Sequence, residues 1–105
     1  MPGVTMMIAK GYIDEKAIGA QGHSWGGYQV AYLATRTDLF SAIESGAPVV
    51  NMFSAYGGIR WGSGMARSFQ YEHTQSRLAA TPWSSPLRYL ENSPLFTMDK
   101  VQTPI

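Results

Sequence analysis

The sequence predicts an α/β fold in which a parallel sheet carries a sharp strand-to-helix turn. Two short apolar runs, residues 17–21 and 40–45, are typical of buried strands, and residues 28–36 between them have the apolar spacing of a helix. Glycines surround the turn that joins the first run to this helix. A strand, a helix and a second strand in this order form a parallel crossover unit, which is almost always right-handed.

The elements at either end of this unit are marked by glycine and proline. Val4, Met7 and Ile8 recur at helical spacing, and Gly11 suits the left-handed position that ends a helix. The second strand is expected to end before Pro48, because proline cannot donate to a central ladder.

The second half of the chain has a different character. Residues 56–64 are rich in glycine and aromatic side chains, and we interpret them as an excursion over the edge of the sheet. A polar helix is predicted over residues 65–79. Ser85-Pro86 and Ser93-Pro94 each predict a further helix start, since each pairs a capping hydroxyl with a proline at the first helical position.

The composition excludes several classes of protein. The 105 residues are 45% hydrophobic and 14% charged, which is typical of one globular domain at most. Eight Lys and Arg residues are scattered and balance seven Asp and Glu residues, so no nucleic-acid partner is expected. The absence of cysteine excludes a disulfide framework, a thiolate metal site and a Cys nucleophile. No leader or long apolar run is visible, which predicts no membrane partner; the location is left unknown, with a cytoplasmic one favoured over the others.

The strongest motif is Gly22-x-Ser24-x-Gly26, between the first predicted strand and the helix. This is the pattern of a nucleophile elbow, in which a strained turn raises a serine hydroxyl above a sheet. Glycines two positions away let strand and helix approach closely, and Gly27 extends that surface. The pattern predicts a partial α/β-hydrolase fold, with Ser24 as nucleophile and the Trp25 backbone N–H as an oxyanion donor. The alternative is a glycine-rich turn without a nucleophile.

A serine nucleophile needs a histidine base and an orienting carboxylate, which in this fold follow the serine in the order Asp or Glu, then His. His23 is adjacent to Ser24, and successive side chains at a sharp turn point apart. His73 falls in the polar helix, where a solvated histidine is the simpler interpretation. Asp99 precedes the last apolar run instead of following it, which favours a loop or capping role. We therefore expect the acid and the base to lie beyond Ile105.

The length supports the same expectation. An α/β-hydrolase sheet usually takes about 200 residues or more. We interpret residues 1–105 as a fragment of a single catalytic domain that holds the nucleophile segment without the acid and base segments. Since loss of triad members costs several orders of magnitude in rate, this segment alone is expected to be inactive.

Several pieces, taken in order, resemble the catalytic domain of the prolyl oligopeptidase family, particularly its dipeptidyl-peptidase and acylaminoacyl-peptidase branches. The most specific piece is the approach to the nucleophile over residues 12–28, including the Gly-Gly-Tyr after Trp25. Residues 42–49 are similar to the family's next strand and Ala-Pro turn, and residues 93–105 to the lead-in to the strand before its catalytic aspartate. The resemblance implies cleavage of short peptides through a Ser24 acyl-enzyme, with no cofactor or metal. It also implies a tyrosine oxyanion donor upstream of Met1 and a propeller domain that restricts substrate size.

The resemblance also directs attention to the residues after the Ala-Pro turn. Candidates for an apolar wall around the substrate side chain preceding the scissile bond are Val49, Met52, Tyr56 and Trp61. Ordinary packing beneath a loop is the alternative for each. The Trp25 side chain either flanks the site or packs on the neighbouring helix.

Two other functions stay open at this point. A carboxylesterase on the same fold would use the same elbow, and a structural or interaction module would leave Ser24 unused. A peptidase is expected to hydrolyse aminoacyl-anilides, whereas a carboxylesterase is expected to hydrolyse only simple acyl esters, so comparing the two substrate classes distinguishes these enzymes. A sheet with few strands and open edges also predicts self-association, or pairing with missing segments of the domain.

Overall fold

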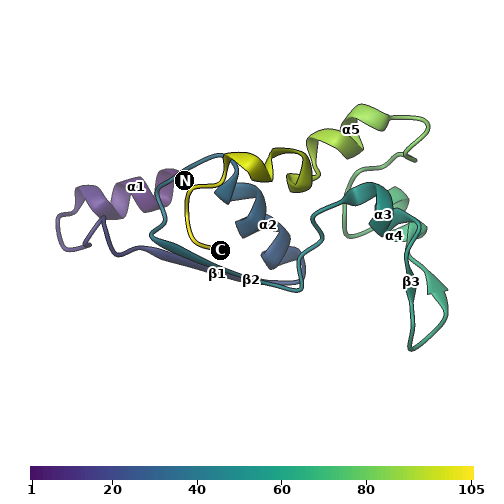
Figure 1. The fold of residues 1–105 in the computed structure, drawn as a ribbon, viewed down its shortest axis with the longest axis horizontal. Coiled ribbons are helices and arrows are strands. Elements are labelled where there is room, and N and C mark those ends of the chain that lie inside the picture. The colour runs from purple at the N-terminus through teal and green to yellow at the C-terminus, as the bar shows by residue number, and fades with distance from the viewer.

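Ten helices and strands follow one another along the chain, and the computed structural model describes all 105 residues (Figure 1). Strands β1 and β2 form a parallel pair, whereas β3 and β4 form a separate antiparallel hairpin. None of the helices has the length and apolar character needed to cross a membrane. The elements are α1 (Pro2–Ala9), β1 (Gly19–His23), α2 (Trp25–Ala34), β2 (Ala42–Gly46), α3 (Met52–Tyr56), β3 (Ile59–Arg60), β4 (Met65–Ala66), α4 (Ser68–His73), α5 (Pro86–Glu91) and the 3₁₀ helix η1 (Pro94–Lys100).

The predicted crossover unit is present as β1, α2 and β2. Gly19 lies opposite Ala42, and the parallel register runs to His23 opposite Gly46. Helix α2 packs on one face of this pair through a small apolar cluster of Val30, Ala34, Phe40 and Ile43. The strand-helix-strand prediction is confirmed, although β1 begins two residues later than residue 17 and α2 begins three residues before residue 28.

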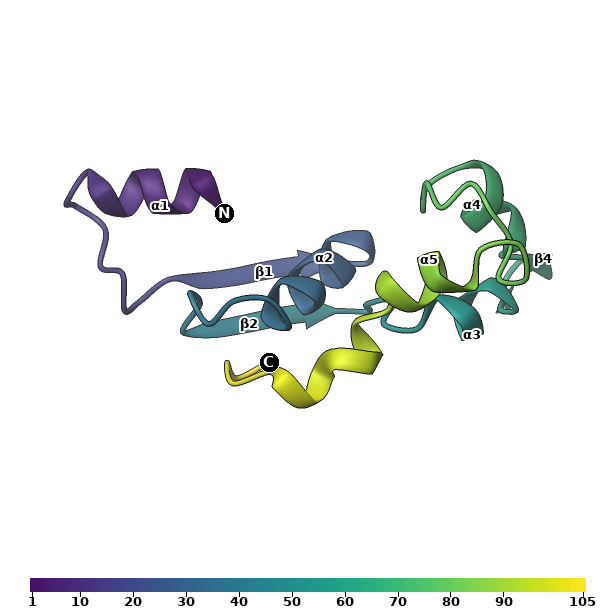
Figure 2. The ribbon, with the colours of Figure 1, turned by 90° about the horizontal axis from the view of Figure 1, so that it is seen from above.

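The C-terminal segment lies along the side of β2 that faces away from β1 (Figure 2). The Ile43 N–H donates to the Pro104 carbonyl at 2.9 Å, and the Thr103 hydroxyl donates to the Phe40 carbonyl at 3.0 Å. Alternate residues of a strand direct their backbone groups to opposite neighbours. Since Gly46 bonds toward the β1 side, Ile43 is on the opposite side, and the chain at Pro104 occupies the position of a third strand.

Helix α1 stands apart from the sheet, as both views show (Figures 1 and 2). It has no buried residue. Gly11 follows its end with a φ of 81°, so the left-handed position predicted for this glycine is confirmed.

The segment from α3 to α5 gathers beyond the carboxyl ends of the strands (Figure 1). Its core is a second apolar cluster of four buried residues: Met52, Tyr71, Leu78 and Tyr89. The rings of Tyr56, Tyr71 and Tyr89 lie 5.9 to 6.4 Å apart within it. This cluster is separate from the one beneath α2.

Two sequence predictions for this half were wrong. The polar helix expected over residues 65–79 is the short α4, because residues 65 and 66 pair in β4 and the chain turns after His73. Arg77 and Ala79 in that turn have φ values of 57° and 52°, which no helix accommodates. The glycine-rich excursion does not cover the sheet either. It forms the β3–β4 hairpin, which projects at the opposite end of the molecule from α1 (Figure 1).

Both Ser-Pro pairs do begin helices, at Pro86 and Pro94, but neither serine caps its helix with its side chain. The Ser93 hydroxyl instead donates to the Tyr89 carbonyl at 2.7 Å and accepts from the Met52 N–H at 2.9 Å. The expected capping role is therefore wrong for both serines, although the helix starts are confirmed.

Candidate active site

Ser24 lies between the last residue of β1 and the first residue of α2 in an unusual backbone conformation. Its φ is 58° and its ψ is −116°, a region that a residue with a side chain rarely adopts and that costs about 1–3 kcal/mol. Two backbone hydrogen bonds hold the turn: the Ser24 N–H donates to the Gly46 carbonyl at 2.8 Å, and the Tyr28 N–H donates to the Ser24 carbonyl at 2.9 Å. The turn is thus fixed to β2 on one side and to α2 on the other.

The glycines around Ser24 permit a close approach of strand and helix. A Cβ on Gly22 would lie 2.2 Å from the carbonyl oxygen of Gly26, and a Cβ on Gly27 would lie 2.4 Å from that of Gly46. No real Cβ approaches backbone so closely. A Cβ on Gly26 would meet nothing within 4 Å, so the expectation that this position must also lack a side chain for close packing was wrong.

The first N–H groups of α2 are free of protein acceptors. Trp25, Gly26 and Gly27 donate no backbone hydrogen bond outside their helix, and no side chain of the chain accepts from them. The positive end of the helix dipole lies at the same place. Ser24 is exposed, and its hydroxyl makes no hydrogen bond within the chain. An accessible hydroxyl and unpaired N–H groups therefore lie side by side.

The Trp25 side chain packs against the second cluster. Its Nε1 donates to Gln75 Oε1 at 3.2 Å, and its ring meets those of Tyr28 and Tyr71 at 5.8 and 6.0 Å. Gln75 Oε1 also accepts from Gln70 Nε2 at 3.0 Å. This contact could not be predicted from the sequence, because the glutamine at residue 75 belongs to no motif.

A cavity of about 630 Å³ opens beside Trp25. Its wall includes Met52 and Leu78 from the second cluster, together with residues of the turn after α4. Tyr28 also lines it, with its hydroxyl donating to Asn92 Oδ1 at 3.3 Å, and burial raises the pKa of Tyr28.

The four predicted pocket residues do not share one cavity. Met52 lines the cavity beside Trp25, and the half-buried Val49 packs against the same cluster. Tyr56 lines a separate cavity of about 390 Å³ next to Trp83, and its hydroxyl donates to Glu72 Oε1 at 2.6 Å. That hydrogen bond is the main cause of the raised pKa of Tyr56, with burial second. Trp61 lies in the β3–β4 hairpin and is 99% exposed.

A model of the prolyl oligopeptidase family matches residues 1–105. The chain belongs to this family. The resemblance read from the elbow and the strands around it is thereby confirmed. The prolyl oligopeptidase family has the α/β-hydrolase fold, and the parallel pair with its crossover helix is compatible with part of it. At the family level the chain is a serine hydrolase of peptidase type. No curated protein matches the sequence.

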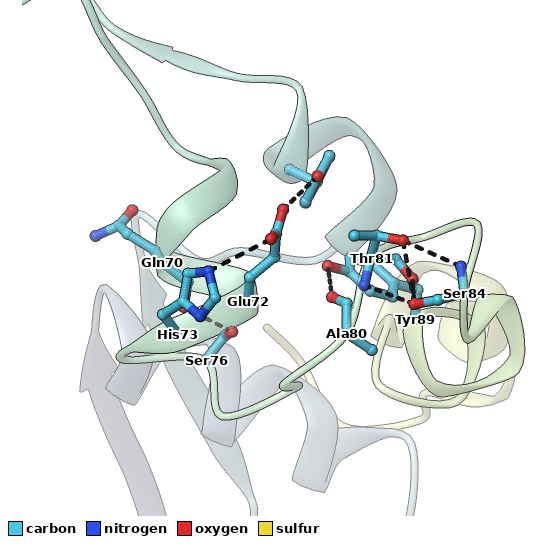
Figure 3. A network of polar contacts seen from close by, with 9 residues as sticks. Gln70, Glu72, His73, Ser76, Ala80, Thr81, Ser84 and Tyr89 are labelled. Carbon is cyan, nitrogen blue, oxygen red and sulfur yellow. Dashed lines mark hydrogen bonds and ion pairs between the residues drawn. The ribbon is translucent and has the colours of Figure 1, made fainter.

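The prolyl oligopeptidase family's chemistry requires a base for the serine, but neither histidine here bonds to Ser24. His73 Nε2 lies 3.5 Å from Glu72 Oε2, and its side chain is 73% exposed (Figure 3). The exposed side chain of His23 lies beside Gly46. Asp99 is exposed within η1 and makes no hydrogen bond through its carboxylate, so the loop or capping role expected for it was wrong.

Proposed function

We propose that this chain supplies the nucleophile of a serine peptidase that cleaves short peptides. Ser24 Oγ attacks the scissile carbonyl carbon, its proton passes to a base, and the amine leaves with a proton to give an acyl-enzyme that water then hydrolyses. The observation that carries the proposal is the Ser24 backbone, with its φ of 58° and ψ of −116° beside an exposed hydroxyl. Strain of this kind persists only where surrounding bonds hold it, and it is concentrated at functional sites.

We propose the Trp25 N–H as one donor of the oxyanion hole. It follows the nucleophile directly, opens α2 and has no acceptor within the chain. A donor already in place when charge develops on the substrate oxygen is worth about 100-fold or more in kcat. The turn after β1 would then supply the nucleophile, and the first N–H of α2 would stabilise the oxyanion.

The base and the orienting acid are proposed to come from residues outside 1–105. His73 is engaged with Glu72, and His23 is next in sequence to the nucleophile at a sharp turn. On this proposal residues 1–105 alone hydrolyse peptides very slowly, because a nucleophile without its triad partners loses several orders of magnitude in rate.

For the apolar wall of the substrate pocket, the proposal is best supported at Met52 and Val49. Met52 lines the cavity that begins at Trp25, and Val49 packs on the same cluster. Tyr56 also packs on this cluster but lines the separate cavity next to Trp83, and Trp61 is on the hairpin.

A fluorophosphonate probe on the full-length protein tests the nucleophile. We expect one labelled peptide, containing Ser24, and we expect labelling and hydrolysis to disappear in Ser24→Ala. Ser63→Ala is the matched control, because Ser63 is another exposed serine, in the hairpin. Labelling elsewhere, or activity that survives Ser24→Ala, would contradict the proposal.

A second measurement separates peptidase from esterase. The peptidase proposal predicts that the full-length protein turns over aminoacyl-anilides through the same Ser24. Hydrolysis restricted to simple acyl esters would instead favour a carboxylesterase on the same fold.

A further inference from the structure

The cavity beside Trp25 has one charged residue in its wall, Arg77. The remaining lining residues are neutral, and no carboxylate of the chain faces this cation from the same wall. Arg77 makes no ion pair and no side-chain hydrogen bond, whereas the Arg88 guanidinium, which lies outside this cavity, donates to the Leu78 carbonyl at 2.7 Å. Arg77 is exposed to solvent, and its guanidinium donors have no acceptor within the chain.

The turn that carries Arg77 is tied to α4. The Arg77 N–H donates to the Thr74 carbonyl at 3.1 Å, and the Ser76 hydroxyl donates to the Gln70 carbonyl at 2.9 Å. Arg77 itself has a φ of 57°, a left-handed conformation that is uncommon for a residue with a long side chain. After it, the Ala79 N–H donates to the Tyr71 carbonyl at 3.2 Å, so bonds on both sides of Arg77 hold its backbone at the cavity wall.

Gln75 adds a second set of donors. The indole Nε1 of Trp25 can only donate, so the atom of Gln75 that faces it must be the amide oxygen. That oxygen also accepts from Gln70, which leaves the Gln75 Nε2 group with two N–H donors and no acceptor in the chain. Gln75 and Arg77 thus both line the cavity with unused donors.

We infer that Arg77 and Gln75 form a carboxylate-binding subsite, so that the enzyme prefers peptides with an acidic side chain close to the scissile bond. The inference rests on the proposed function, since it names the substrate class of that same site. A guanidinium binds a carboxylate with two parallel hydrogen bonds, and such charged bonds are about twice as strong as neutral ones. The apolar wall at Met52 and Leu78 excludes water from one side of the subsite and strengthens the attraction. Trp25 lines the same cavity and directly follows Ser24 in the chain.

Matched peptide pairs test this preference on the full-length protein. Each pair differs by Glu against Gln at a single position, scanned across the residues that flank the scissile bond. We expect kcat/KM to be about tenfold higher for Glu at one position. Arg77→Gln should abolish the preference, and Arg77→Lys should keep part of it. Arg36→Gln is the control, because it removes the same charge at the end of α2, where Arg36 lies over the Tyr32 ring.

Gln75→Glu is the second variant. Its carboxylate keeps both acceptor bonds to Trp25 and Gln70 but loses the two free donors and adds a negative charge. The Glu preference should therefore disappear or reverse. An unchanged Glu preference in Arg77→Gln overturns the inference, as does an equal loss of kcat/KM for both peptides of a pair.

Labelling of Ser24 keeps this test distinct from that of the proposed function. A protein that reacts with fluorophosphonate at Ser24 but shows no Glu preference at any scanned position contradicts the carboxylate subsite alone. A protein whose Ser24 does not react contradicts the proposed function.

Discussion

Three glycines near Ser24 differ in what a side chain would meet, and this difference predicts three different mutants. In Gly22→Ala the new methyl group would lie 2.2 Å from a backbone oxygen, so strand and helix must separate. We expect the free energy of unfolding of the full-length protein to fall by about 3 kcal/mol or more. Gly27→Ala should destabilise the protein by a similar amount. At Gly26 a new methyl group would meet open space within a helix, so Gly26→Ala should change the free energy of unfolding by less than about 1 kcal/mol. Denaturant unfolding measures all three, and equal losses in Gly22→Ala and Gly26→Ala would contradict the close-packing account.

A single buried tyrosine sets a second prediction at the residue scale. Burial raises the pKa of Tyr89 to about 12, and its hydroxyl donates to the Ala80 carbonyl at 2.7 Å (Figure 3). The unfolded value is about 10, so the neutral form stabilises the folded state. That contribution is complete below about pH 10 and is lost as the pH rises through about 12. Chemical denaturation at a series of alkaline pH values should show the free energy of unfolding falling as the pH rises. In Tyr89→Phe the free energy of unfolding should fall less steeply with pH. A slope unchanged in Tyr89→Phe would show that the other tyrosines account for it.

The elbow could be predicted from sequence because all its determinants are local. Glycine spacing, the strand before it and the helix after it fall within a few residues of Ser24, and the structure has all of them. The cavity wall could not be predicted in the same way. Trp25 meets Gln75 across a separation of 50 residues, and the strained turn at Arg77 replaces what reads as a continuous polar helix. Tertiary contacts decided these features, and no single sequence window contains them.

At the scale of elements, the two Ser-Pro helix starts also separate what local sequence determines from what tertiary contacts determine. Ser85 and Ser93 look alike in the sequence, and both precede the first residue of a helix. Only Ser93 connects elements: it accepts from the Met52 N–H at the start of α3 and donates to the Tyr89 carbonyl in α5. The hydroxyl therefore holds together two helices that begin far apart in the chain.

This contact predicts unequal effects of two matched substitutions. Ser93→Ala would leave the buried Met52 N–H without a partner, which costs about 1–3 kcal/mol of stability. Ser85→Ala removes no side-chain cap and should change stability by less than about 0.5 kcal/mol. Thermal or denaturant unfolding of the two full-length variants gives the comparison. If both variants lost the same free energy of unfolding, the two hydrogen bonds of Ser93 would make no contribution to stability beyond that of any serine before a helix.

At the scale of the whole molecule, these 105 residues enclose little core for their surface. The accessible area is 6772 Å², whereas a compact protein of this mass exposes about 5,800 Å². The radius of gyration is 15.8 Å, against about 13 Å for a compact chain of this length. The 15 buried residues include two separate apolar clusters of four. We propose that a partner covers this surface, either other segments of the catalytic domain or a second copy.

The exposed edge of the sheet predicts how residues 1–105 behave when produced alone. Gly19, Gln21 and His23 on β1 make no hydrogen bond outside the β1–β2 pair, so this edge can add another strand. We expect concentration-dependent association in analytical ultracentrifugation and a broad thermal transition. Gln21→Lys places a charge on this edge and should reduce association, whereas Gln29→Lys on the exposed side of α2 should not. A monomer that melts cooperatively would show that the two small clusters suffice to hold the segment folded, and association unaffected by Gln21→Lys would assign it to another surface.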